Sequence, residues 1–154
     1  MEKSFDDYLA RGISLLEAGE YGKAATEFRQ CTAREPQNPE GYFYLGEALA
    51  QGGDPEVAKA AYREGLRLAP EDNQALTALG DIYYEQGQHK DALQAYKKAT
   101  EVAPKDADGY VSMGLVYNSM ERTEEAIKAY NTALELDPKN VFAYNALGDA
   151  WYGL

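Results

Sequence analysis

The apolar residues of this chain recur with the period of an α-helix. Between residues 73 and 106, Leu76, Leu79 and Tyr83 are separated by three and four positions, as one face of a helix requires. Ala92 and Tyr96 are also four positions apart in the second half of the same segment. No part of the sequence has the strict alternation of apolar and polar residues that is typical of a half-buried β-strand. The pattern therefore predicts an all-α fold built from pairs of amphipathic helices.

The pattern returns every 34 residues. Glycine, proline, alanine and an aromatic residue all keep this interval. They do so at Gly12, Gly46, Gly80, Gly114 and Gly148, at Pro36, Pro70, Pro104 and Pro138, at Ala24, Ala58, Ala92 and Ala126, and at Phe28, Tyr62, Tyr96 and Tyr130. A period that four residue types share indicates a repeat array. Since repeat arrays work as extended binding surfaces, the period favours binding over catalysis.

The periodic prolines also divide the chain into units. With proline at position 32, residues 1–154 form a single array of four full repeats and one further first helix. The repeats are 5–38, 39–72, 73–106 and 107–140, and the lone helix is 141–154. Position 15, where a left-handed residue is expected to end the first helix, holds Gly19, Gly53 and Gly87, and then Glu121.

Within each unit the residue types follow one scheme. An aromatic residue occurs at position 4, Leu-Gly at positions 7–8, an aromatic at 11, Ala at 20, an aromatic at 24, Ala at 27 and Pro at 32. In the fourth repeat these are Tyr110, Met113, Gly114, Tyr117, Ala126, Tyr130, Ala133 and Pro138. The scheme resembles the tetratricopeptide repeat family over residues 5–154, with departures that include Arg11, Cys31, Gly65 and Leu76. The resemblance implies a right-handed alpha superhelix, an alpha-alpha solenoid of helix-turn-helix repeats with a concave groove.

Charge narrows the choice of partner. The chain has 26 acidic and 15 basic residues, a net charge of −11. Nucleic acids and anionic membranes attract positive surfaces, so neither is an expected partner. The first residues, MEKSFDDYLA, lack the apolar core of a signal peptide, and no apolar run reaches the length of a membrane span. We therefore expect a soluble, cytoplasmic protein.

The sequence contains no recognisable constellation for catalysis. His89 is the only histidine and Cys31 the only cysteine, so neither a metal site nor a catalytic triad is indicated. Cys31 replaces alanine at position 27 and is expected to be a small buried residue. We predict that the chain is not an enzyme and needs no cofactor or metal ion.

The resemblance implies that ligands bind along the first helix of each repeat, at positions 2, 5, 9 and 12. The candidate groove residues are Leu9, Ile13, Glu40, Phe43, Glu47, Thr77, Asp81, Tyr84, Asp108, Val111, Leu115, Asn118, Asn145 and Asp149. None of them is Lys or Arg, so the Lys, Asn and Arg clamp with which some members bind a chaperone's C-terminal carboxylate is missing. Apolar side chains among carboxylates suit a basic and hydrophobic peptide or helical segment.

Residues 141–154 form a first helix without its second helix, and they are rich in apolar residues. Phe142, Tyr144, Leu147, Trp151, Tyr152 and Leu154 are spread around this segment. An array normally ends in a helix with a polar outer face. Two interpretations remain open: the chain is the repeat part of a longer protein, or copies of it associate through this helix as a self-assembling scaffold.

Overall fold

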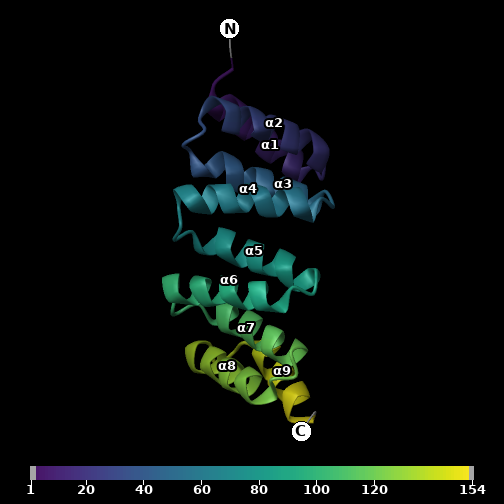
Figure 1. Cartoon of the computed structure of the whole chain (residues 1–154), viewed down its shortest axis with the longest axis vertical. Helices are drawn as coiled ribbons and strands as arrows, with labels where there is room; N and C mark the ends of the chain where they lie inside the picture. Colours follow the sequence, from purple (N-terminus) through teal and green to yellow (C-terminus); the bar gives the residue numbers. More distant parts are fainter. Residues whose placement is uncertain (1–2, 153–154) are drawn as a thin grey trace. The chain divides into compact units, whose positions relative to one another are not determined.

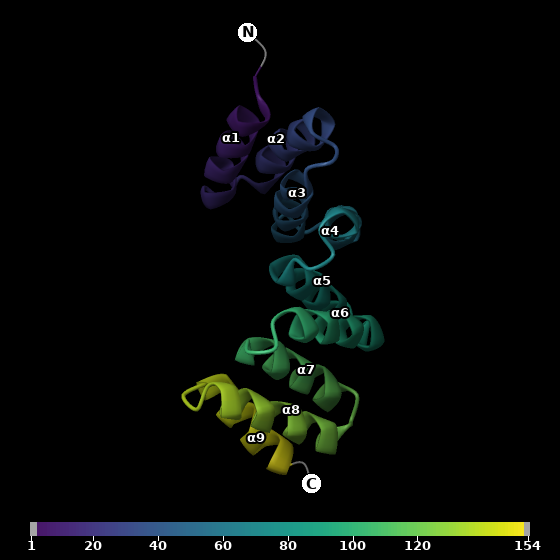
Figure 2. The same ribbon diagram turned by 90° about the vertical axis from the view of Figure 1, so that its left-hand side faces the viewer.

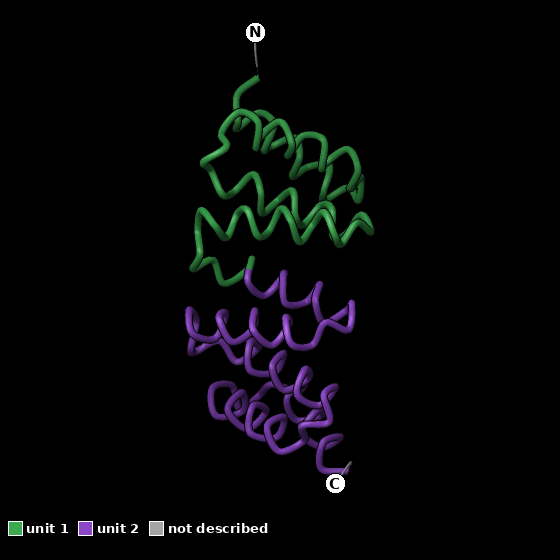
Figure 3. The backbone as a smooth tube through the Cα atoms, viewed as in Figure 1, with its two compact units in different colours: residues 1–75 green, residues 76–154 purple. Residues whose placement is uncertain are grey.

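A computed structural model describes residues 3–152 of the chain, which form nine helices and no strand (Figure 1). The chain divides into two compact units, residues 1–75 and 76–154 (Figure 3). The all-α fold predicted from the period of the apolar residues is thus confirmed for the described residues.

The first unit contains four helices that follow one another closely. They are α1 (Phe5–Glu17), α2 (Tyr21–Arg34), α3 (Pro39–Gln51) and α4 (Pro55–Leu68). Each packs against the next, and α1 also touches α3, so that the first helices of two consecutive repeats are neighbours (Figure 2).

The second unit repeats this arrangement with one helix more. Its helices are α5 (Asn73–Glu85), whose first three residues belong to the first unit, α6 (His89–Val102), α7 (Ala107–Ser119), α8 (Thr123–Leu136) and α9 (Val141–Tyr152). Helix α7 packs against α6 and α8, and α9 packs against α8 and touches α7. Figures 1 and 2 both place α9 beside α8.

Short polar side chains start the first helix of every pair. The Ser4 hydroxyl accepts a hydrogen bond from the backbone N–H of Asp7, and the Asp7 carboxylate accepts one from the backbone of Ser4. These hydrogen bonds hold the pKa of Asp7 below its usual value. Asn38 and Asp106 cap α3 and α7 by accepting a hydrogen bond from the backbone N–H two residues further on. Capping satisfies backbone donors that the helix itself leaves unpaired.

The turns inside the helix pairs use left-handed backbone at position 15. Gly19, Gly53 and Gly87 have φ angles of 74°, 84° and 71°. Glu121 takes the same conformation, with φ of 58°, although it carries a side chain. A residue with a Cβ atom in this region costs about 1 kcal/mol relative to glycine. The turn geometry is therefore conserved between the pairs even where the residue type is not.

An aromatic ring seated on a glycine locks each helix pair. A Cβ atom added to Gly12 would lie 2.4 Å from the ring of Phe28, and one added to Gly114 would lie 2.3 Å from the ring of Tyr130. Gly46 faces Tyr62 and Gly80 faces Tyr96 in the same manner, at 2.8 and 2.6 Å. Only a residue without a side chain leaves room for the ring, which explains why glycine and the aromatic residue share the 34-residue period.

Two of the departures from the repeat scheme have a packing explanation. Gly65 replaces alanine, and a Cβ atom there would lie 2.4 Å from the ring of Phe43, so the glycine makes room for that ring. Cys31 is fully buried, as expected, and burial raises the pKa of its thiol to about 11. A thiol that stays protonated in a closed site is a packing group rather than a nucleophile.

Candidate functional site

In the first unit, the candidate residues lie on α1 and α3, which touch each other. Leu9 and Ile13 on α1 are half-buried, and Glu40 at the start of α3 is exposed. Phe43 is half-buried because its ring covers Gly65 of α4. Glu47 accepts a hydrogen bond from the amide of Gln51 at 3.1 Å. Glu40 is thus the most accessible charge of this part of the site.

In the second unit, the candidate residues lie on α5, α7 and α9, and two side-chain hydrogen bonds connect these helices. The hydroxyl groups of Tyr84 on α5 and Ser119 at the end of α7 are 3.1 Å apart. The amide of Asn140, which caps α9, donates to the carboxylate of Asp108 on α7 at 3.2 Å. The first helices of successive pairs are therefore held side by side by members of the candidate set.

Seven of these residues form what we call the acidic face of the second unit: Asp81, Tyr84, Asp108, Leu115, Asn118, Asn145 and Asp149. All are exposed except Tyr84, which is half-buried. Leu115 is the one apolar member of this set and keeps 39% of its surface in contact with solvent. Thr77 is half-buried, and Val111 is buried, so the free chain presents little of Val111 to a ligand.

Asp81 has a structural partner that the sequence pattern did not indicate. The hydroxyl of Tyr96 on α6 donates a hydrogen bond to its Oδ1 atom at 2.5 Å. Desolvation beside this buried ring raises the pKa of Asp81, while the hydrogen bond acts in the opposite direction. Burial and the nearby carboxylate both raise the pKa of Tyr96, which stays a neutral donor. The Oδ1 atom of Asp81 therefore takes part in packing α6 against α5.

Tyr130 on α8 is the counterpart of Tyr96 but has no such partner. Its side chain is fully buried, and its hydroxyl makes no hydrogen bond. The residue that corresponds to Asp81 in this helix pair is Leu115, which cannot accept one. Whether the buried hydroxyl has a partner could have been inferred from the sequence. The residue fifteen positions before the aromatic at position 24 shows whether an acceptor is present.

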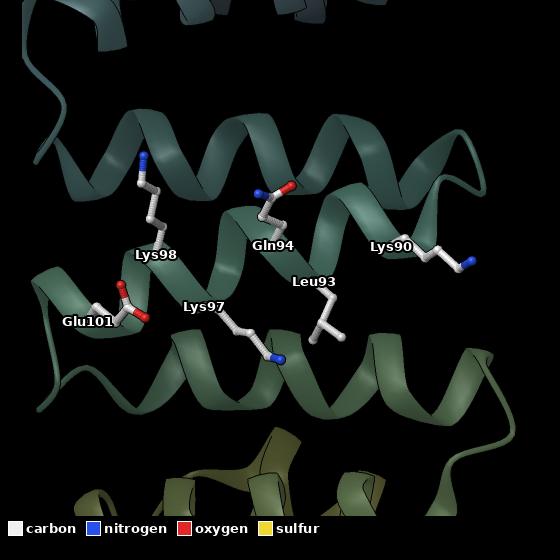
Figure 4. A pocket seen from close by; sticks show the side chains of 6 residues that line it. All are labelled: Lys90, Leu93, Gln94, Lys97, Lys98 and Glu101. Carbon is white, nitrogen blue, oxygen red and sulfur yellow. The ribbon is translucent and has the colours of Figure 1, made fainter.

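Basic side chains gather instead on a second helix. Lys90, Lys97 and Lys98 border a shallow hollow of about 390 Å³ on α6, together with Leu93, Gln94 and Glu101. Figure 4 shows Lys98 and Gln94 directed to one side of α6, and Lys97 and Leu93 directed to the other. These three lysines lie on α6 and are not part of the acidic face.

Other chemistry is sparse among residues 3–152. His89 is the first residue of α6. Its ring lies 5.8 Å from that of Tyr84, and its Nδ1 atom has no hydrogen-bond partner. No group of three His, Cys, Asp or Glu side chains in this range is arranged to hold a metal ion. None of the helices described is both long enough and apolar enough to cross a bilayer.

These features define a class of protein: an array of helix pairs locked by ring-on-glycine contacts, with its polar candidate site on the first helices. Family models described as TPR repeat and tetratricopeptide repeat match residues 9–58, 39–82, 80–120 and 114–154. The chain therefore belongs to the tetratricopeptide repeat family, which confirms the resemblance seen in the sequence.

Solved structures of the same family have the same fold. A crystal structure of MamA matches with a TM-score of 0.90 and 26% identity, over 97% of this chain and 81% of that one. MamA from residue 41 to its end, from Desulfovibrio magneticus RS-1, matches with a TM-score of 0.91 and 27% identity, over 99% and 86%. YrrB, described as a TPR protein with an unusual peptide-binding site, matches with a TM-score of 0.83 and 22% identity, over 93% and 74%. No curated protein sequence was found to match the chain.

Proposed function

We propose that this chain is a non-catalytic protein-interaction module that binds a basic and hydrophobic peptide or helical segment along its first helices. The observation that carries the proposal is the absence of Lys and Arg from the candidate residues, in a chain that has 15 of them. Membership of the tetratricopeptide repeat family supports a protein ligand, and YrrB offers a precedent for a peptide in this fold.

The acidic face supports the chemistry of this ligand. Asp108, Asp149 and the second oxygen of Asp81 offer negative charge, and the exposed Leu115 offers an apolar contact. A ligand with Lys or Arg between Leu-like side chains complements both features. Since much of this attraction acts between exposed charges, salt weakens it.

Two labelled helical peptides test the proposal by fluorescence anisotropy. Both carry Leu on one face and differ only in having Lys or Glu at the remaining positions. We expect the Lys peptide to bind with a Kd on the order of micromolar, weaker at high salt, and the Glu peptide to bind at least about tenfold more weakly. Equal or tighter binding of the Glu peptide would overturn the proposal.

A pair of charge reversals locates the binding surface. Asp149→Lys changes the acidic face and avoids Asp81 and Asp108, which hold other side chains. Glu135→Lys makes the same change of charge at an exposed position of α8, a second helix. We expect only Asp149→Lys to weaken the Lys peptide several-fold. An equal loss in both variants would mean that the net charge, and not the acidic face, attracts the peptide.

Association between copies is a second candidate function, as a scaffold joined through residues 141–154. The observation that favours it is the exposure of Phe142 and Tyr152 on α9; Leu154 lies outside the described residues. Trp151→Ser is then expected to reduce association in sedimentation experiments over a wide range of concentration. A constant monomeric mass would remove this candidate.

A further inference from the structure

The hydroxyl of Tyr130 on α8 is a buried polar group that the free chain leaves unpaired. The side chain is fully buried with its ring on Gly114, and the hydroxyl finds no hydrogen-bond partner among the described residues. Nearly every buried polar group in a protein is paired, because an unpaired one lowers stability. An unpaired hydroxyl beside a candidate binding surface therefore points to a partner outside the chain.

The preceding helix pair shows where a tyrosine in this position directs its hydroxyl. The ring of Tyr96 lies on Gly80 as that of Tyr130 lies on Gly114. Its hydroxyl donates to Asp81 on α5 at 2.5 Å, and Ser112 on α7 is close enough to act as a second partner. The hydroxyl thus lies between two successive first helices, next to a member of the acidic face.

The two corresponding positions around Tyr130 hold apolar residues. Leu115 on α7 comes 34 residues after Asp81, and Ala146 on α9 comes 34 residues after Ser112. Helix α8 packs against both α7 and α9, as the equivalence of the pairs requires. Neither apolar side chain can form a hydrogen bond. The lack of a partner is therefore set by residues 115 and 146 of this chain.

The surroundings of this hydroxyl are negatively charged. Burial, and to a lesser degree Tyr84 and the carboxylate of Asp149, raise the pKa of Tyr130 to about 12, so both of these groups lie near it. Asp149 and Leu115 are exposed on the acidic face, to which no Lys or Arg belongs. A ligand group at this place is therefore met by a carboxylate, a neutral hydroxyl and an apolar side chain.

We propose that the hydroxyl of Tyr130 accepts a hydrogen bond from the ammonium group of a ligand lysine, whose stem packs on Leu115 and whose charge is balanced by Asp149. The inference rests on the function proposed above and names the ligand residue that the acidic face recognises. An ammonium has three N–H donors, so it can contact Tyr130 and Asp149 together. Its compact shape suits a single acceptor oxygen, whereas the planar guanidinium of arginine suits two acceptors side by side.

The lysine reaches the hydroxyl by displacing the side chain of Leu115. Exposed side chains change rotamer within nanoseconds, and such changes are common when a partner binds. An exposed hydroxyl would have to give up a hydrogen bond to water before it could bind a ligand. The buried hydroxyl of Tyr130 has no such bond to lose, so its pairing with the ligand contributes more fully to affinity.

The experiment uses the 154-residue protein, the labelled Lys peptide and a second peptide in which every lysine is trimethylated. Trimethyl-lysine keeps its positive charge but has no N–H to donate. Tyr130→Phe removes only the hydroxyl. We expect this variant to bind the Lys peptide at least about tenfold more weakly than the original protein does. We expect the trimethylated peptide to bind both proteins equally.

Tyr110→Phe is the matched control variant in the same unit. Tyr110 lies two positions after Asp108 and five before Leu115, and so on the opposite side of α7 from both. Its hydroxyl donates to the backbone carbonyl of Pro104 at 3.3 Å. We expect Tyr110→Phe to bind the Lys peptide as the original protein does. Circular dichroism checks that both variants are folded under the conditions of the binding assay.

The outcomes separate this inference from the proposed function. If the Lys peptide binds the original protein and Tyr130→Phe with equal affinity, the inference is wrong and the acidic face still binds basic peptides. If Tyr130→Phe weakens both peptides to the same extent, the hydroxyl does not meet an ammonium group, and the inference is wrong as well. If the Lys peptide does not bind the original protein at all, the proposed function itself fails.

Discussion

At the scale of single residues, the aromatic side chain at position 24 depends on the residue fifteen positions before it. The hydroxyl of Tyr96 donates a hydrogen bond to Asp81. Phe28 has no hydroxyl, and the residue fifteen positions before it is the apolar Ile13. Tyr130 combines a hydroxyl with Leu115 and remains buried without a hydrogen bond, and burial raises its pKa to about 12. A buried polar group without a partner costs about 1–3 kcal/mol of stability.

The two tyrosines are therefore expected to respond oppositely to the same substitution. Tyr130→Phe removes an unsatisfied hydroxyl and is expected to raise the free energy of unfolding by about 1 kcal/mol. Tyr96→Phe removes the donor to Asp81 and is expected to lower it by about 1–2 kcal/mol. Urea denaturation followed by circular dichroism measures both, with shifts of the midpoint in opposite directions. A destabilised Tyr130→Phe would mean that its hydroxyl has a partner after all.

At the scale of the helices, the sequence was sufficient to predict the architecture because each determinant is local. The helical period and the left-handed position 15 both act within a few residues of the chain. The same holds for Glu121. Its backbone has the same left-handed conformation as the glycines at position 15 of the other repeats, although it carries a side chain. The 34-residue period then indicated that the helix pairs of the successive repeats pack alike. The ring-on-glycine contacts within these pairs confirm this prediction.

The candidate site was less predictable, because side-chain partners depend on packing between helices. The spacing of positions 2, 5, 9 and 12 indicated one helical stripe but not which members another side chain engages. Val111 is buried, Phe43 covers Gly65, and Asp81 and Asp108 each accept a hydrogen bond from another element. A departure from the repeat scheme can indicate such a partner. Gly65, which replaces alanine, leaves room for the ring of Phe43 on the preceding helix.

At the scale of the whole molecule, the fold is held together by short-range contacts along the chain. Within each unit the main contacts join helices that are adjacent or next but one in sequence. In such arrays, stability is close to the sum of the stabilities of the repeats and of the interfaces between neighbours. A local defect is therefore expected to weaken nearby helices and to leave distant ones protected.

Ala143→Asp tests this expectation at the C-terminal end. Ala143 is fully buried, so the substitution places a carboxylate on the side of α9 that faces the array and is expected to detach this helix. Hydrogen exchange measured by mass spectrometry should then be faster in α9 and in α8, against which α9 packs, and unchanged in α1 and α2. Asn145→Asp, which adds the same charge at an exposed position of α9, is the control and should leave exchange in all helices unchanged. Faster exchange throughout the chain in Ala143→Asp would show that the molecule unfolds as one cooperative unit, because only global unfolding links α9 to α1.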